Sequence, residues 1–400
     1  MKKKSICLLL MLAMAASLVL PGCGKKNETK VTTQFAPIDE PIPEETTVEE
    51  QQPEETEAEP EPEEEPVEEV VDNEQPPREG MVRSSMTNEW IDAELAERRP
   101  LAVMYPINKQ AQPQYGLDRV EVFYEIMEEG DMSRQMAIME DWSDLGRIGN
   151  IRSIRDYFVY AGLEWDPIFI HFGGPELYVK SILTREDVDN INGVGGGMGP
   201  DYGAYYRVPA GSTSEHTAYT DGQHVLDAID RAGFSKNHRS QYWEPNHFQF
   251  VNASNPNTLE QYSNAVAATE IDMTKAFPVT QSALTYNESD HKYYKRLYGN
   301  AQCDAVTGTQ LAFDNVIIQN TYYERRDDHG YLAFQMHDTT RDGYFITRGK
   351  MIHVTWRKEG DYKPTRYFDD NGNEIKLNTG KTMIFVVRLG DSFTINGNTY

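Results

Sequence analysis

Short apolar runs separated by polar turns begin near Trp90 and continue to the end of the chain. Runs that are wholly apolar, or that alternate apolar and polar residues, predict strands. In the first half of this region they are residues 101–105, 119–124, 134–139 and 167–172. Helical spacing of apolar residues, or a proline in a first turn, predicts helices at residues 151–163, after Pro175, and at 222–232. Strands mixed with helices favour a mixed α/β domain over residues 87–258, with its sites at strand-to-helix loops.

The last third of the chain changes to strands. They are predicted at residues 283–298 (two strands around a polar turn), 316–319, 331–335, 343–347, 350–356 and 381–387. Short strands at close intervals, with a hairpin turn signal at 370–373, favour an antiparallel all-β domain over residues 259–400. Its many tyrosines could stack on sugars or peptides, but β core and cross-strand pairing explain them better.

The N-terminus carries an export signal rather than a structural helix. Three lysines precede an apolar run at residues 5–20, and Cys23 then follows a small residue. This pattern predicts a lipoprotein signal peptide over residues 1–22 and a lipidated Cys23, with a palmitate-type membrane anchor. The alternative is an ordinary secretory signal in which Cys23 is incidental. In the exported domain Cys303 would be the remaining thiol, so no disulfide framework is expected.

Residues 23–86 are predicted to form a disordered tether. Residues 31–80 include 19 acidic residues and nine prolines, so they cannot bury enough apolar surface to offset the cost of ordering. This segment explains much of the net charge of −26. A spacer is a better interpretation than a recognition tail for a basic partner. The acidic balance also argues against nucleic acid as a partner, because phosphate backbones require Lys and Arg patches.

Several segments, in order along residues 98–390, resemble the YerB-like lipoproteins of Gram-positive bacteria. They include RPLAVMYPIN (99–108), EGDMSRQMAIM (129–139), IGNIRSIRDYF (148–158), IHFGGPE (170–176), LAFDNVIIQ (311–319) and GKMIHVTWRKE (349–359). The resemblance implies an α/β N-terminal part and a β-rich C-terminal part. It also implies a lipid anchor on the extracytoplasmic face of the membrane, in a Gram-positive type of envelope, and it supplies no established reaction.

The candidate site is a group of basic and polar residues around one loop. Arg152, Ser153 and Arg155 precede a predicted helix, where backbone N–H groups and guanidinium forks can bind a carboxylate or phosphate. The full set predicted to bind a ligand is Arg134, Arg152, Ser153, Arg155, His171, Gly173, Gly174, Arg207 and His216. Most of these match the YerB-like pattern, as the resemblance implies, whereas Pro175, Glu215 and Thr217 depart from it. A structural alternative is that the arginines pair with Glu125, Glu129 or Asp156.

Other chemistries have weaker support. His171 and His216 could bind a metal together with a nearby glutamate, but no HExxH or CxxC motif accompanies them, so no metal or other cofactor is expected. Ser153 lacks the G-x-S-x-G elbow of hydrolases. The glycine-rich loop 193–203 matches no phosphate-binding motif, and we interpret it as a surface loop.

Two functions follow from these residues, and a structural spacer or assembly factor is a third option that does not depend on them. The preferred one is a cell-surface lipoprotein that binds an anionic or peptidic envelope component, either a cell-wall polymer or an envelope protein, through an Arg/His cleft. The alternative is a hydrolase or transferase that acts on a cell-wall polymer through His171, His216 and the arginines.

Overall fold

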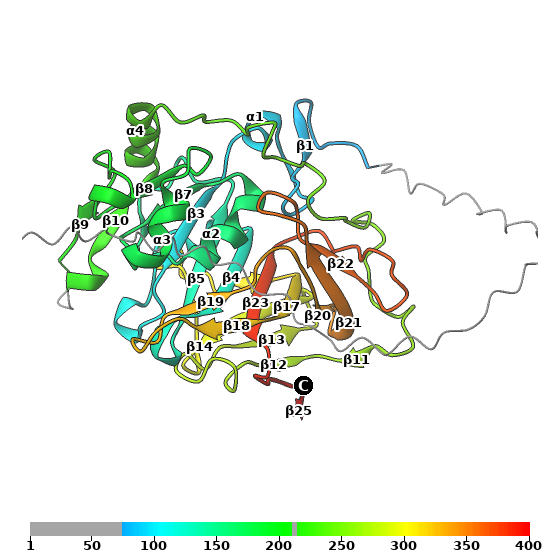
Figure 1. The fold of residues 1–400 in the computed structure, drawn as a ribbon. Coiled ribbons are helices and arrows are strands. Elements are labelled where there is room, and N and C mark those ends of the chain that lie inside the picture. Colours follow the sequence, from blue (N-terminus) through cyan, green and yellow to red (C-terminus); the bar gives the residue numbers. More distant parts are fainter. Residues whose placement is uncertain (1–73, 210–213) are drawn as a thin grey trace, which may run out of the picture. The chain divides into compact units, whose positions relative to one another are not determined.

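The computed structural model describes residues 74–209 and 214–400 (Figure 1). Its largest sheet has 11 strands in the order β11-β21-β20-β17-β23-β4-β5-β3-β7-β8, and β22 pairs with β21 off this path. In that order they are β11 (Val266–Ala267), β21 (Lys350–Lys358), β20 (Thr339–Thr347), β17 (Asn315–Thr321), β23 (Thr382–Arg388), β4 (Val122–Met127), β5 (Ser133–Met139), β3 (Leu101–Tyr105), β7 (Ile168–His171), β8 (Asn190–Asn192) and β22 (Arg366–Phe368).

Strands from both halves of the chain meet in the middle of this sheet. β23 lies between β17 and β4 and runs parallel to both, with Thr382 opposite Asn315 on one side and Val122 on the other. The prediction of a purely antiparallel C-terminal part is therefore wrong at the β17–β23 pair. The physical reason is burial, because residues 382–387 are all buried, and continuous apolar runs are typical of parallel strands covered on both faces.

A second sheet of seven strands comes from the C-terminal part. It comprises β15 (Asn300–Ala301), β14 (Lys292–Leu297), β13 (Ala283–Asn287), β12 (Glu270–Asp272), β24 (Thr394–Ile395), β25 (Asn398–Thr399) and β16 (Ala312–Phe313). Smaller sheets join β6 (Ile148–Gly149), β10 (Ala218–Thr220) and β9 (Tyr206–Arg207), then β1 (Met81–Arg83) and β2 (Trp90–Asp92), then β18 (Tyr323–Arg325) and β19 (Leu332–Phe334). The β13–β14 hairpin confirms the two strands predicted around a polar turn.

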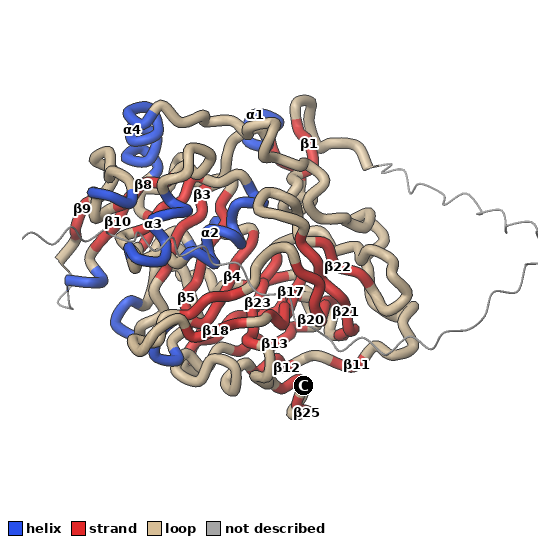
Figure 2. Tube along the Cα trace, in the orientation of Figure 1, coloured by secondary structure: helices blue, strands red, loops and turns tan. Residues whose placement is uncertain are grey.

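Helices are few, and Figure 2 shows α2, α3 and α4 in the half of the molecule that contains β3 and β7. The α-helices are α1 (Ala93–Ala96), α2 (Asp156–Gly162), α3 (Glu176–Leu183) and α4 (Gly222–Ala232). The 3₁₀ turns are η1 (Lys109–Ala111), η2 (Leu117–Arg119), η3 (Glu129–Asp131), η4 (Leu163–Trp165), η5 (Gly196–Met198) and η6 (Ser214–His216). The prediction for 222–232 is confirmed. Asp221 caps this helix by accepting a bond from the His224 backbone, and Gly233 ends it in the left-handed region.

The helix predicted over 151–163 is shorter, because its first residues bond to other segments. The backbone N–H groups of Ile151, Arg152 and Ile154 donate to the carbonyls of Ala218, Met104 and Gly173. The Arg152 carbonyl also accepts a bond from the Phe172 N–H, so it is not free for the N–H four residues further on, as a helix requires. Residues 151–155 are therefore extended, and α2 begins at Asp156.

One hydrophobic core draws on both halves of the described chain and includes the fully buried Trp142, Trp165 and Trp356. The ordered part begins before residue 87, since β1 pairs with β2 and Met86 is buried. The predicted tether is thus too long at its C-terminal end. The predicted signal peptide, Cys23 and the tether up to residue 73 lie outside the described residues. Among residues 74–209 and 214–400, no helix is both long and apolar enough to span a membrane.

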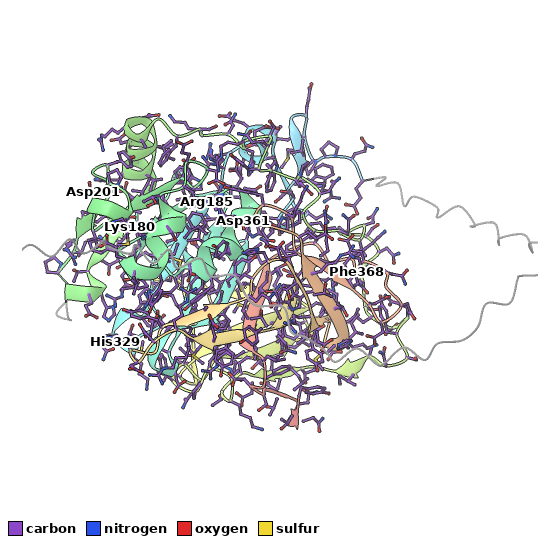
Figure 3. All side chains as sticks on the ribbon, viewed as in Figure 1. Lys180, Arg185, Asp201, His329, Asp361 and Phe368 are labelled. Atoms are coloured by element: carbon purple, nitrogen blue, oxygen red, sulfur yellow. The ribbon has the colours of Figure 1, made fainter. Side chains whose placement is uncertain are left out.

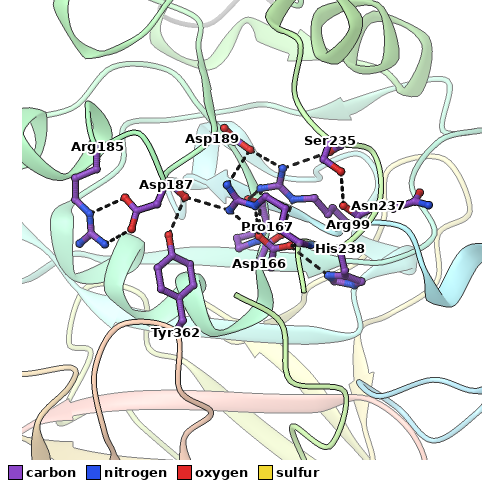
Figure 4. A network of polar contacts seen from close by, with 11 residues as sticks. Arg99, Asp166, Pro167, Arg185, Asp187, Asp189, Ser235, Asn237, His238 and Tyr362 are labelled. Carbon is purple, nitrogen blue, oxygen red and sulfur yellow. Dashed lines mark hydrogen bonds and ion pairs between the residues drawn. The ribbon is translucent and has the colours of Figure 1, made fainter. Parts of the chain in front are cut away.

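Charged side chains also join the two halves. Arg185, from the loop after α3, forms ion pairs with Asp187 and with Asp361 of the C-terminal part (Figure 3). Figure 4 shows the adjoining network, in which the Tyr362 hydroxyl donates to the Asp187 carbonyl at 2.7 Å. Deeper in the network, the fully buried Arg99 forms an ion pair with Asp189 at 2.5 Å. Buried charges of this kind are tolerated because each is paired and hydrogen-bonded.

Candidate functional site

The extended segment 152–154 forms the base of the candidate site. It lies against the end of β7, where the Arg152 carbonyl accepts a bond from the Phe172 backbone and the Ile154 N–H donates to the Gly173 carbonyl. Gly173 has a φ of +77°, which favours glycine, and its N–H donates to Asn192. A Cβ on Gly174 would lie 2.9 Å from the Ile154 carbonyl oxygen. The paired glycines therefore permit the close approach of the two segments.

Arg134 and Arg155 are held by a pair of glutamates at the β4–β5 turn. Arg134 donates to Glu128 at 2.6 Å and to the Ser153 carbonyl at 2.8 Å. Arg155 donates through Nε to Glu129 at 2.8 Å and forms an ion pair with Glu128 at 3.1 Å. Burial lowers the pKa of Arg134 to about 10, although Glu128 opposes this effect. At neutral pH both arginines are charged and already neutralised by carboxylates.

Arg152 and His216 are held less firmly. Arg152 donates to the carbonyl oxygen of Glu215 at 3.3 Å, and its guanidinium lies 3.4 Å from the carboxylate of the same residue. That carboxylate side chain is 63% exposed. His216 is 5% exposed. Nδ1 of His216 and Nε of Arg152 are buried and have no hydrogen-bond partner within the described residues. Burial, and secondarily the charge of Arg152, lowers the pKa of His216, so its imidazole is neutral at pH 7.

Groups within the protein are hydrogen-bond partners of His171, Ser153 and Arg207. His171 is fully buried, with Nδ1 2.9 Å from the Gly173 carbonyl and Nε2 3.1 Å from the side-chain oxygen of Asn190. Burial lowers the pKa of His171. The Ser153 hydroxyl donates to the Phe172 carbonyl at 3.1 Å.

Arg207 lies beside the same loop. It donates to Thr217 at 2.9 Å, and its guanidinium lies 4.8 Å from the centre of the Phe172 ring.

The structure thus brings Arg134, Arg152, Ser153, Arg155 and His216 to one loop, and it connects His171 to that loop through Gly173 and Gly174. The counter-charges were only partly foreseen from the sequence. Arg155 does pair with Glu129, as the structural alternative proposed, whereas Glu125 and Asp156 pair with Lys295 and Arg326.

Sequence reasoning missed Glu128 as the partner of Arg134. The signal was present, because β4 and β5 form a hairpin in which Met127 lies opposite Ser133. In this antiparallel register Arg134 lies opposite Ile126, so Glu128, two residues after Ile126, is its diagonal neighbour. In the described part of the chain, no three His, Cys, Asp or Glu residues are placed to hold a metal ion.

Comparison with known proteins identifies the fold. Residues 86–235 match the N-terminal domain of a protein family of unknown function, DUF3048, and residues 272–384 match the C-terminal domain of that family. The chain belongs to this YerB-like family. It is 25% identical over 316 residues to the putative lipoprotein YerB of Bacillus subtilis, a match that covers 79% of this chain and 89% of that protein.

The crystal structure of YerB from Bacillus subtilis has the same fold, with a TM-score of 0.64 and 23% identity over 76% of this chain and 96% of that one. The YerB-like identity predicted from the sequence is therefore confirmed. The two matched regions correspond to the N-terminal and C-terminal parts, and their strands share the β23–β4 junction of the large sheet.

Proposed function

We propose that this YerB-like protein is a lipid-anchored surface protein, attached through Cys23, that binds an anionic or peptidic component of the cell envelope. The lipoprotein name of its Bacillus subtilis relative supports the anchor. The binding site would be the Arg152–His216 site, which we define as Arg152, Glu215 and His216. The extracytoplasmic location belongs to this proposal, because a wall polymer or envelope protein is accessible only there.

The single observation that carries the proposal is the weak pairing of Arg152 with Glu215. Its contacts to Glu215 are 3.3 and 3.4 Å, longer than the 2.6 to 2.8 Å contacts of Arg134 and Arg155 in the same cluster. Exposed ion pairs contribute at most about 1 kcal/mol. An incoming carboxylate or phosphate can therefore displace Glu215 at little cost and form a charge-assisted pair with the guanidinium fork.

His216 adds a second contact. A neutral imidazole with one unpartnered nitrogen can donate to, or accept from, a ligand that binds beside Arg152. The buried pairs of Arg134 and Arg155 would then act as positioning residues that fix the loop. Catalysis at Ser153 has less support, because its hydroxyl already donates to the Phe172 carbonyl.

The test is binding of the purified full chain to isolated Gram-positive cell walls, prepared with and without their anionic polymers. We expect Arg152→Ala to weaken binding about tenfold or more, since a hydrogen bond to a charged group contributes about 1.5–3 kcal/mol. Arg231→Ala is the matched control, because Arg231 is an exposed arginine that forms a surface pair with Asp227 on α4.

Equal binding by the wild type, Arg152→Ala and His216→Ala would refute the proposal. Mass spectrometry of the incubated walls separates binding from the enzymatic alternative. Soluble products that disappear in His216→Ala would instead show a hydrolase or transferase.

A further inference from the structure

A second site lies between the two family regions. It is a pocket of about 370 Å³. One wall comes from η1 and the residues after it, including Lys109, Gln112 and Pro113. The other comes from the end of β14 and from β15, including Leu297 and Tyr298. Pockets of this size at the junction of two parts of a fold are typical ligand sites.

The charge of this pocket is unusual for so acidic a chain. Its lining contains Lys109 and no carboxylate. The ammonium of the exposed Lys109 lies 4.7 Å from the centre of the Tyr298 ring, and no carboxylate among the residues that the structure describes pairs with it. Asp304, which follows the lining residue Cys303, accepts hydrogen bonds at its carboxylate from the backbone N–H groups of Gly116 and Leu117.

The carboxylate behind the pocket is also neutralised. Gln302 lines the pocket and exchanges hydrogen bonds with Gln135, which donates to the buried Glu125. Glu125 forms an ion pair with Lys295 at 2.9 Å, and neither side chain is exposed. The charge at the pocket that has no counter-charge among the described residues is therefore the positive charge of Lys109.

A buried polar atom of the lining that has no partner among the described residues is a hydrogen-bond donor. Nε2 of Gln112 is buried and has no partner in the described part of the chain. Burial raises the pKa of the Cys303 thiol, so this group does not add a negative charge. Pro113 and Leu297 supply apolar surface. A ligand that fits must accept hydrogen bonds, carry a negative charge and cover a small apolar area.

We propose that this site, the Lys109 pocket, binds a small ligand with a carboxylate, an amide carbonyl and a short apolar side chain. An N-acyl amino acid and the carboxyl end of a short peptide share this chemistry. The carboxylate would pair with Lys109, the carbonyl would accept from Gln112, and the side chain would lie on Leu297 and Pro113. At about 30 Å³ for each group the size of a water molecule, the pocket admits roughly a dozen non-hydrogen atoms with their hydrogens.

The test titrates the full chain with N-acetylleucine, its neutral analogue N-acetylleucinamide, and the peptide N-acetylalanylalanine, followed by calorimetry or NMR. Ligands of this size bind in about the millimolar range. We expect the acid to bind at least about tenfold more tightly than the amide. Lys109→Met should remove that preference, and Gln112→Leu should weaken both ligands. Lys275→Met is the control, because the Lys275 ammonium donates to Thr399 on the surface.

Urea unfolding of each variant separates loss of the site from loss of the fold. Preferential binding of the peptide or of the amino acid derivative shows which of these two ligand classes the pocket binds, and either result supports the proposal. Equal affinity for acid and amide would overturn the proposal. So would an unchanged affinity in Lys109→Met, or the absence of saturable binding to the wild type.

Discussion

The ion pair between Glu125 and Lys295 joins the two family regions inside the protein, and it gives the sharpest test of the fold. Glu125 lies on β4 and Lys295 on β14, and both side chains are fully buried. The hydroxyls of Ser133 and Ser282 donate to the same carboxylate at 2.6 and 2.7 Å. Burial alone would raise the pKa of Glu125, but Lys295 and these hydroxyls more than offset it, so the pKa is lowered.

The perturbation is Lys295→Met, which keeps the length of the side chain and removes the charge. Glu125 then remains as an uncompensated buried carboxylate, and breaking a buried pair in this way costs about 3–5 kcal/mol. The double variant Glu125→Gln/Lys295→Met removes both charges, and the new amide can still bond to the two serines. We expect it to lie within about 1 kcal/mol of the wild type, because replacing a whole buried pair is often neutral.

The assay is urea unfolding of the full chain at pH 5 and pH 8 for the wild type, the single variants Lys295→Met and Glu125→Gln, and the double variant. In Lys295→Met the pKa of Glu125 should rise above its unfolded value. Stability is then present at low pH and is lost as the pH rises through the folded pKa, so the variant should be closer to the wild type at pH 5 than at pH 8. The double variant should show no such trend. A cost below about 1 kcal/mol at pH 8, or an equal cost for the double variant, would refute the reasoning.

Two further predictions concern stability. Burial raises the pKa of Glu140 from 4.5 to about 7, which corresponds to about 3 kcal/mol of stability lost as the pH rises through 7. Glu140→Gln should remove this loss, so in urea unfolding the variant should be more stable than the wild type at pH 8.5 and equally stable at pH 4. The same dependence of stability on pH in the variant and the wild type would contradict this prediction. A Cβ on Gly222 would lie 2.1 Å from the backbone oxygen of Ser143, so Gly222→Ala should cost about 1–3 kcal/mol. Gly146→Ala serves as the control, because a Cβ at this position meets nothing within 4 Å. Equal unfolding midpoints for Gly222→Ala and Gly146→Ala would show that the start of α4 can move to make room for the new methyl group.

The sequence predicted local elements better than it predicted their assembly. Alternating or apolar runs located β3, β5 and β7, and helical spacing located α4, because these patterns are fixed by neighbours in the chain. The insertion of β23 between β17 and β4 depends on residues more than 250 positions apart, and no local pattern reports it. The same limit applied to α2, whose expected first turn is extended because its backbone bonds to Ala218, Met104 and Gly173.

The candidate site shows the same limit in its electrostatics. A cluster of arginines in the sequence indicated an anion site, yet an acidic chain supplies carboxylates to most of its cations once it folds. Arg326 forms an ion pair with Asp156, and Lys358 forms one with Glu164, each with a partner from the other half of the chain. The number of basic residues in a loop is therefore a poor guide to binding, and the residual charge after pairing is a better one. By that criterion the informative cations are Arg152, which a displaceable carboxylate holds at 3.4 Å, and Lys109, which faces a pocket lined without carboxylates.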